Sequence, residues 1–210
     1  MFYPVFIDLQ NRPVLVVGGG TVAERKVESL LEAGARVTVV SPEVKNSLLD
    51  HASQQRIALH QRQFVSTDMD GVLLVVSATD DAATQREVAS LALSKNVLVN
   101  TVDRPDLCSF IVPAILRRGD ITLAISTSGK SPSLAAALRT RFDRVLTEDM
   151  ARTASLLGVV RPEVHERFPG SDERKRVFDR IIDSGILDWI GECDDTAALE
   201  RVRRMIDEIS

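Results

Sequence analysis

Apolar residues in the first half of the chain follow two alternating spacings. A continuous apolar run rich in β-branched residues, typical of a strand buried on both faces of a parallel sheet, occupies residues 14–17. Further runs of strand type occupy residues 36–40, 57–59, 72–77 and 97–102, and the run at 57–59 is the weaker one. Between them, residues 22–31 and 82–94 show helical spacing. Gly34 ends the first of these helices, and Asp80 or Asp81 caps the second. This alternation predicts an α/β domain with a parallel sheet and right-handed crossovers.

The second half begins with two further runs of strand type. They lie at residues 110–113 and 121–126 and are joined through residues 117–120. A long helix over residues 133–146 follows, because Ser131-Pro132 supplies an N-cap and a proline at the first helical position.

From Glu148 on, the pattern is helical and rich in charge. We expect the helices to be interrupted at glycine and proline, that is at Gly158, Pro162, Pro169-Gly170 and Gly185. The sequence therefore predicts three parts. They are a Rossmann-like dinucleotide-binding domain over residues 1–112, a small β/α connecting segment over residues 113–147 and a C-terminal helical domain over residues 148–210.

Composition excludes several classes of protein. The chain has 210 residues, of which 44% are hydrophobic and 27% charged, as in ordinary globular domains. The net charge of −4 argues against general nucleic-acid binding. No apolar run approaches the roughly 20 residues that span a bilayer, and the N-terminus lacks the pattern of a signal peptide. We therefore expect a cytoplasmic protein that binds neither membrane nor nucleic acid.

The cysteines and histidines give no metal site. Cys108 and Cys193 lie far apart and form no C-x-x-C pair, which argues against a thiolate-bound metal or a disulfide scaffold. We interpret Cys108 as a small apolar filler. The histidines, which show no ligand spacing, are His51, His60 and His165. The sequence predicts no protein-bound metal.

A glycine-rich loop follows the first strand. Residues 18–23 read G-G-G-T-V-A and fit G-x-G-x-x-A between a strand and a helix, which is the context of a dinucleotide fingerprint. Gly18 makes the tight turn, and Gly20, the second glycine of the motif, lets the backbone approach a pyrophosphate, with Gly19 between them. The N–H groups at the start of the helix can bind the phosphates. The alternative is a tight turn without a ligand.

The ribose-binding acid of that fingerprint is missing. An Asp or Glu is expected at the end of the second strand, where this chain has Ser41, Pro42 and Glu43. Ser41 can donate one hydrogen bond, and Glu43 is close enough along the chain to reach a ribose. No arginine follows to accept a 2′-phosphate, so the sequence favours NAD over NADP.

Polar residues follow the fourth and fifth strands, whose carboxyl ends border the ligand crevice of such sheets. Thr79 comes after the fourth strand, and Asn100, Val102 and Asp103 end the fifth. We expect the fifth strand near the nicotinamide, so that Asp103 can act as a general base or orient the substrate. The alternative is that Asp103 only begins a turn.

A second loop combines hydroxyls with a lysine at the start of a helix. Ser128, Gly129, Lys130 and Ser131 lie there, and Arg139 follows along the helix. Such a group can bind a polyanion. It is not a Walker A loop, because the position of the leading glycine holds an alanine. A capped helix start with solvated charges is the alternative.

Many short motifs occur in an order that resembles one family, the precorrin-2 dehydrogenases and sirohydrochlorin ferrochelatases. This family includes the N-terminal module of siroheme synthase and free-standing proteins. The resemblance extends from Met1 to about Phe142 and more loosely through the helical tail. The motifs are Pro4-Val5-Phe6, residues 17–20, 22–26, 31–35, 78–81, 100–103 and 109–113, and Ser131-Pro132.

The resemblance implies an activity, partners and residue roles. Precorrin-2 would be oxidised to sirohydrochlorin with NAD⁺ as hydride acceptor, and some family members also insert Fe²⁺. The family implies a homodimer held by the segment at residues 113–147. Its key carboxylate matches Asp103, and its nucleotide contacts match Thr21-Val22 and Pro42-Glu43. A serine that is phosphorylated in some members matches Thr127 here, so that modification is not carried over.

These implications give a hypothesis and two alternatives. The tetrapyrrole would lie between the carboxyl edge and the loop at Ser128. Its eight carboxylates would suit Lys130 and Arg139. Asp103 would orient the macrocycle or take a proton, and would remove pyrrole protons if Fe²⁺ is inserted. The alternatives are an NAD(H)-sensing subunit without catalysis and a dehydrogenase of a smaller polyacid.

Overall fold

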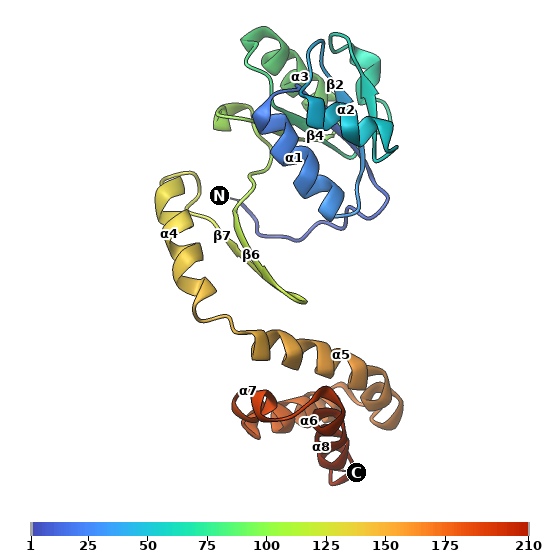
Figure 1. Ribbon diagram of the computed structural model, residues 1–210, viewed down its shortest axis with the longest axis vertical. Helices are drawn as coiled ribbons and strands as arrows, with labels where there is room; N and C mark the ends of the chain where they lie inside the picture. The colour runs from blue at the N-terminus through green and yellow to red at the C-terminus, as the bar shows by residue number, and fades with distance from the viewer. Residues whose placement is uncertain (1, 210) are drawn as a thin grey trace. The chain divides into compact units, whose positions relative to one another are not determined.

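The computed structural model describes residues 2–209, and the chain divides into two compact units. The first is Met1–Val112 and the second is Pro113–Ser210. Each unit is described by itself, with its elements labelled in Figure 1. Among the described residues, no helix has both the length and the apolar character of a membrane span.

A five-stranded parallel sheet forms the centre of the first unit. Its order is β3-β2-β1-β4-β5, the order of the first five strands of a doubly wound dinucleotide-binding fold. The predicted parallel sheet is therefore confirmed. The strands are β1 (Pro13–Val17), β2 (Arg36–Val40), β3 (Ile57–His60), β4 (Leu74–Ser77) and β5 (Leu98–Thr101).

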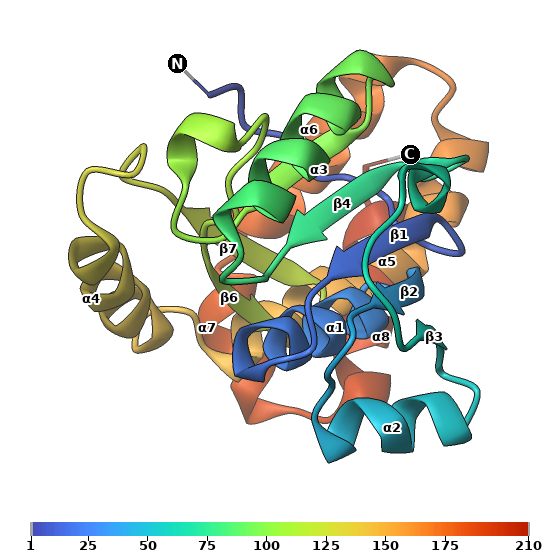
Figure 2. The ribbon, with the colours of Figure 1, turned by 90° about the horizontal axis from the view of Figure 1, so that it is seen from above.

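Helices cover both faces of this sheet. Helices α1 and α2 lie on one face and α3 on the other, as Figure 2 shows. Short 3₁₀ turns, η1 and η2, precede β4 and follow β5. The bounds are α1 (Thr21–Glu32), α2 (Asn46–Ser53), η1 (Ser66–Met69), α3 (Ala82–Ser94) and η2 (Pro105–Leu107).

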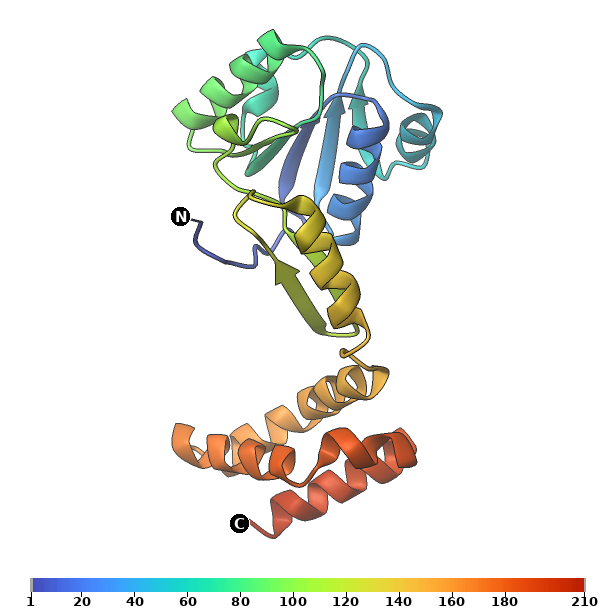
Figure 3. The ribbon, with the colours of Figure 1, turned by 90° about the vertical axis from the view of Figure 1, so that its left-hand side faces the viewer.

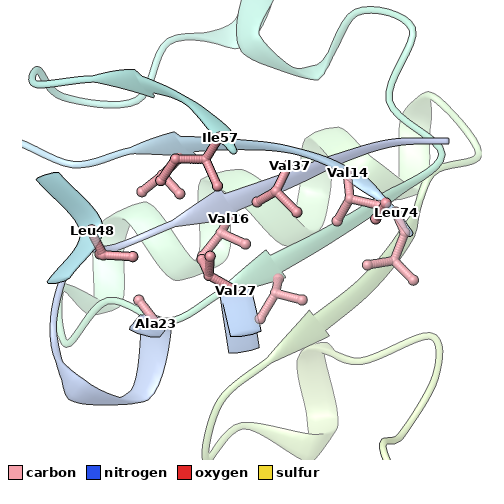
Figure 4. Packing of buried hydrophobic residues seen from close by; sticks show 11 residues of the cluster. Val14, Val16, Ala23, Val27, Val37, Leu48, Ile57 and Leu74 are labelled. Atoms are coloured by element: carbon pink, nitrogen blue, oxygen red, sulfur yellow. The ribbon is translucent and has the colours of Figure 1, made fainter. Parts of the chain in front are cut away.

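Burial on both faces explains the continuous apolar strands. Val14 and Val16 of β1 face α1, while Leu15 and Val17 face the opposite core. Figure 4 shows how Val14 and Val16 pack with Val27 of α1. Each fully buried side chain of this kind contributes roughly 1.5–3 kcal/mol. This packing holds the first turn of α1 at the end of β1.

Two predictions for the middle of the chain were wrong. Residues 110–113 form no strand: the N–H groups of Ser109 and Phe110 donate to the Val99 carbonyl, and Pro113 has no N–H for a ladder. The hairpin instead consists of β6 (Ala114–Arg118) and β7 (Ile121–Ile125), so residues 117–118 lie within a strand. Helix α2 had no counterpart in the predicted elements.

The second unit combines this antiparallel hairpin with helices. Helix α4 packs against β6, and helices α5 to α8 share one apolar core, visible as the lowest group of helices in Figure 3. The bounds are α4 (Pro132–Asp143), α5 (Glu148–Arg167), α6 (Ser171–Asp183), α7 (Ile186–Trp189), η3 (Ile190–Glu192) and α8 (Asp195–Asp207).

Helix α5 passes through two residues that were expected to interrupt it. Pro162 lacks the N–H that would bond the Gly158 carbonyl four residues earlier. Gly158 is exposed and borders open space, so water can satisfy that carbonyl. Buried Val160 and Val164 fix the inner face of the helix on both sides of the proline. The interruptions at Pro169-Gly170 and Gly185 are confirmed.

Candidate functional site

The first two glycines of the loop after β1 are enclosed by backbone. Gly18 has a φ of +126°, and a Cβ there would lie 2.3 Å from the Ala78 carbonyl oxygen. A Cβ on Gly19 would lie 2.1 Å from the carbonyl oxygen of Glu43. The Gly18 N–H also donates to the Val40 carbonyl at 2.9 Å. Only glycine lets the loop pass this closely between the ends of β2 and β4.

Gly20 differs from its neighbours because it is exposed and borders open space. It is the N-cap of α1, and among the described residues no side chain caps this helix. The first N–H groups of a helix have no partner within the helix, and this includes those of Thr21 and Val22. They lie where α1 begins, just past the carboxyl end of β1. The helix dipole adds positive potential there. The loop therefore fits the pyrophosphate of a dinucleotide.

The segment after β2 is tied to the glycine loop. The buried Ser41 donates its hydroxyl to the Glu43 carbonyl at 2.6 Å, so its proton is already engaged. The Lys45 N–H donates to the Gly19 carbonyl at 3.0 Å. Pro42 and Glu43 are exposed. Ser41 therefore shapes the turn that presents Pro42 and Glu43, and its hydroxyl has no proton left to donate to a ribose.

At the end of β4, Thr79 takes part in the start of α3. Its hydroxyl accepts from the Asp81 N–H at 3.3 Å, and its carbonyl accepts from the Gln85 amide at 2.7 Å. Asp81 is the N-cap of α3, which settles the choice between Asp80 and Asp81. The Thr84 hydroxyl and backbone N–H lower the pKa of Asp81, so it stays ionised as a cap.

Asp103 stands on a tight turn just past the end of β5. Its φ is +58°, a left-handed conformation that aspartate tolerates better than most residues, and its side chain is exposed. The Arg104 N–H donates to the Thr101 carbonyl at 3.3 Å, and the Val102 N–H donates to Ser77 at 2.9 Å. Among the described residues, the Asp103 carboxylate has no hydrogen-bond or ion-pair partner. The residue thus begins a turn and also presents a free carboxylate.

Cys108 has a larger role than the apolar filler that the sequence indicates. Its sulfur lies 3.1 Å from the Thr101 nitrogen, whose N–H it accepts, and 3.3 Å from the carbonyl oxygens of Thr101 and Arg104. Asn100 donates its amide to the Phe110 carbonyl at 3.1 Å. Burial raises the pKa of the Cys108 thiol, which keeps it protonated. Cys108 and Asn100 therefore fix the turn that carries Asp103.

Lys26 is a charged residue near this turn that the sequence does not single out. It lies in α1 and is half-buried, and burial lowers the pKa of its ammonium group. Its charge acts on Cys108. In the sequence, only its position between Ala23 and Val27, which the structure buries, hints that Lys26 is partly enclosed. The pattern of the helix alone gives no reason to distinguish Lys26 from a solvated neighbour such as Arg25.

The predicted loop at residues 127–131 lies in the second unit. The Thr127 hydroxyl accepts from the Ser131 N–H and donates to the Ser131 carbonyl, both at 3.0 Å. Ser131 caps α4 by accepting from the Leu134 N–H at 3.2 Å, as predicted. Ser128 and Gly129 have φ values of +55° and +79°.

The charged groups of this part of the chain face solvent. Lys130 in the loop and Arg139 in α4 are both exposed. Because Thr127 and Ser131 fix the loop internally, Lys130 is held near the start of the helix. The arrangement can bind an anion and is equally a capped helix start.

Two further observations concern metal binding and a groove in the second unit. No group of three or more His, Cys, Asp or Glu side chains within residues 2–209 is arranged to hold a metal ion. A groove of about 450 Å³ lies between α5 and α6. Its lining contains none of the predicted site residues and consists of Ala154, Leu157, Gly158, Arg161, Lys175, Phe178 and Asp179.

The sheet order, the enclosed glycines and the uncapped start of α1 define a Rossmann-type dinucleotide-binding domain. Residues 5–114 match a family model described as "Putative NAD(P)-binding", and the chain belongs to that family.

Relatives named siroheme synthase are similar to most of the chain. The one from Methylobacillus flagellatus is 41% identical over 184 residues, which cover 88% of this chain and 39% of the relative. The one from Thioalkalivibrio sulfidiphilus is 38% identical over 206 residues, which cover 98% of this chain and 42% of the relative. This chain therefore spans about two fifths of the length of these relatives.

A solved structure is similar over almost the whole chain. It is named SirC, precorrin-2 dehydrogenase, and superposes with a TM-score of 0.78 at 27% identity. The match covers 99% of this chain and 98% of that one. Together with the siroheme synthases, it confirms the resemblance to the precorrin-2 dehydrogenase family. The chain thus belongs to the NAD(P)-binding family and is similar over most of its length to the siroheme synthases and to this precorrin-2 dehydrogenase.

Proposed function

We propose that this protein is an NAD-dependent dehydrogenase that oxidises precorrin-2 to sirohydrochlorin. The observation that carries the proposal is the likeness to SirC, precorrin-2 dehydrogenase, which extends through both units at nearly full coverage. A likeness confined to residues 5–114 would support cofactor binding alone.

The residues at the carboxyl edge fit a dinucleotide in three places. Gly18, Gly19 and Gly20 with the N–H groups of Thr21 and Val22 would hold the pyrophosphate. The segment from Ser41 through Pro42 to Glu43 would border the adenosine ribose. The exposed Glu43 carboxylate disfavours a 2′-phosphate, which supports NAD over NADP. Thr79, Asn100 and Val102 would border the nicotinamide, which supplies a hydride acceptor when the cofactor is bound.

Asp103 is the residue to which we assign proton transfer. Oxidation of precorrin-2 removes a hydride and a proton, and the proton needs an acceptor. The Asp103 carboxylate is exposed, has no partner among the described residues and is held at the end of β5. One of its oxygens would accept the proton as the macrocycle becomes desaturated.

Substituting Asp103 tests this assignment. Asp103→Asn keeps the size of the side chain but removes the base, so kcat should fall by about 10²-fold or more. The Kd for NAD⁺ should stay at the wild-type value, because the glycine loop is unchanged. Asp106→Asn is the matched control, since Asp106 lies in the same segment but is bonded to Arg104. A wild-type kcat in Asp103→Asn would reject the role.

The second unit carries groups that suit an anionic substrate. Precorrin-2 carries eight carboxylates, and some of them can be bound by the exposed Arg139 together with Ser128, Gly129, Lys130 and Ser131.

Insertion of Fe²⁺ into sirohydrochlorin is a further proposal, with iron as a substrate and Asp103 as acceptor of the pyrrole protons. Adding Fe²⁺ to enzyme-bound sirohydrochlorin and recording the absorbance spectrum tests it.

We also propose that the protein is a homodimer held by residues 113–147 and works in the cytoplasm. A two-stranded hairpin such as β6–β7 is marginal by itself. Exposed apolar side chains accompany it, namely Ile115, Leu134, Phe142 and Val145. Sedimentation should give twice the 23.1 kDa mass of the chain. Two free cysteines are consistent with a reducing compartment.

A further inference from the structure

Lys26 occupies a position where a charge is costly. It precedes Val27 in α1 and follows Ala23 by one helical turn, and both of these side chains are fully buried under the sheet. Lys26 is itself half-buried, and the loss of water around its ammonium lowers its pKa. A neutral residue at this place would avoid that cost.

The direction of the helix places the ammonium toward the candidate site. Side chains in a helix tilt toward its N-terminus, and the N-terminus of α1 lies at the carboxyl edge of the sheet. The charge of Lys26 acts on Cys108, whose sulfur contacts the Thr101 backbone at the end of β5. Lys26 is therefore close enough to the end of β5 for its charge to act on Cys108, which lies seven residues after Thr101 and five after Asp103.

No carboxylate among the described residues neutralises Lys26. Some cations in the first unit do have such partners: Arg104 forms two hydrogen bonds to Asp106, and Lys45 lies 2.9 Å from Glu24. The neighbouring Arg25 adds positive charge and lowers the pKa of Lys26 further. A half-buried cation without a counter-charge is suited to bind an anionic ligand.

We propose that Lys26 binds a carboxylate of the tetrapyrrole and so orients the macrocycle toward Asp103. The inference rests on the proposed function, because it takes the substrate from it. A carboxylate is favoured over a cofactor phosphate for two reasons. The N–H groups at Thr21 and Val22 would already serve the phosphates, and the charge of Lys26 acts on Cys108, which lies beyond the glycine loop.

Direct binding of sirohydrochlorin, measured by absorbance titration without turnover, tests the proposal. Lys26→Gln should raise its Kd by on the order of tenfold, because one charged hydrogen bond is lost. The KM for precorrin-2 should rise similarly, while the calorimetric Kd for NAD⁺ should not change. Lys26→Arg should restore most of the affinity for sirohydrochlorin. The matched control is Arg25→Gln on the exposed side of the same helix, which should bind like wild type.

Other outcomes would overturn the proposal. An unchanged Kd for sirohydrochlorin in Lys26→Gln would do so, and so would a loss of NAD⁺ affinity alone, which would assign Lys26 to the phosphates. Failure of wild type to bind sirohydrochlorin would reject the role as well. If wild type binds sirohydrochlorin through Lys26 but does not oxidise precorrin-2, the Lys26 role stands and the dehydrogenase activity is rejected.

Discussion

Three consecutive glycines in the loop after β1 serve two different purposes. Gly18 and Gly19 are required by the fold, because a Cβ on either would overlap backbone of the segments after β4 and β2. Gly20 is not required by packing, since it borders open space. Its small size matters only if a ligand approaches the start of α1. The two kinds of glycine can therefore be separated by experiment.

Alanine substitutions should separate folding from cofactor binding. Gly18→Ala should destabilise the first unit by about 1–3 kcal/mol or more, because it adds strain at a positive φ to a steric overlap. Gly20→Ala should keep the wild-type Tm and bind NAD⁺ on the order of tenfold more weakly, because its Cβ occupies the space of the pyrophosphate. Calorimetry and thermal unfolding measure both effects. Wild-type NAD⁺ affinity in Gly20→Ala would place the phosphates elsewhere.

The sequence predicted the place of Asp103 but not how it is held. A strand followed by Asp103 places its carboxylate at the carboxyl edge by topology alone. The contacts of Cys108 with Thr101 and Arg104 depend on a chain reversal through η2, which hydrophobic spacing does not encode. Lys26 was missed for a similar reason, since its half-burial follows from tertiary packing of α1.

At the scale of elements, periodicity and capping residues located most helices and strands. Helix α3 and strand β2 have the bounds that the pattern predicts. The errors have local causes. Residues 110–113 are apolar, yet their segment bonds to the edge of β5 through Ser109 and Phe110. Helix α5 tolerates Pro162 because the carbonyl that loses its partner belongs to exposed Gly158.

The cap of α3 should contribute a pH-dependent part of the stability. The pKa of Asp81 is lowered by hydrogen bonds from Thr84, so its contribution is complete at neutral pH and is lost as the pH falls through that lowered pKa. Asp81→Ala should therefore lower Tm at pH 7, and the difference from wild type should shrink in acid. Asp80→Ala, at an exposed neighbour that does not cap, is the control. An equal loss at every pH would contradict the account.

At the scale of the whole molecule, the chain has two units with separate apolar cores. The residues proposed to bind the cofactor belong to the first unit. The chain's single tryptophan, Trp189, is buried in the helical core of the second. Tryptophan fluorescence therefore reports unfolding of the second unit alone, and circular dichroism reports both.

This separation predicts that NAD⁺ stabilises one unit selectively. At 100 times its Kd, NAD⁺ should add about 2.7 kcal/mol to the unfolding free energy of the first unit. The Tm seen by circular dichroism should rise, while that seen by the fluorescence of Trp189 should stay constant. If NAD⁺ shifts both signals equally, the two units unfold as one and the division fails as an energetic description.

The central claim is tested most directly by an anaerobic absorbance assay with purified protein, precorrin-2 and NAD⁺ or NADP⁺. The account predicts that the spectrum of precorrin-2 changes to that of sirohydrochlorin with NAD⁺, at a rate proportional to the protein concentration. The same reaction with NADP⁺ should be much slower. No change with either cofactor, in a protein that still binds NAD⁺, would contradict the dehydrogenase and favour an NAD(H)-sensing subunit.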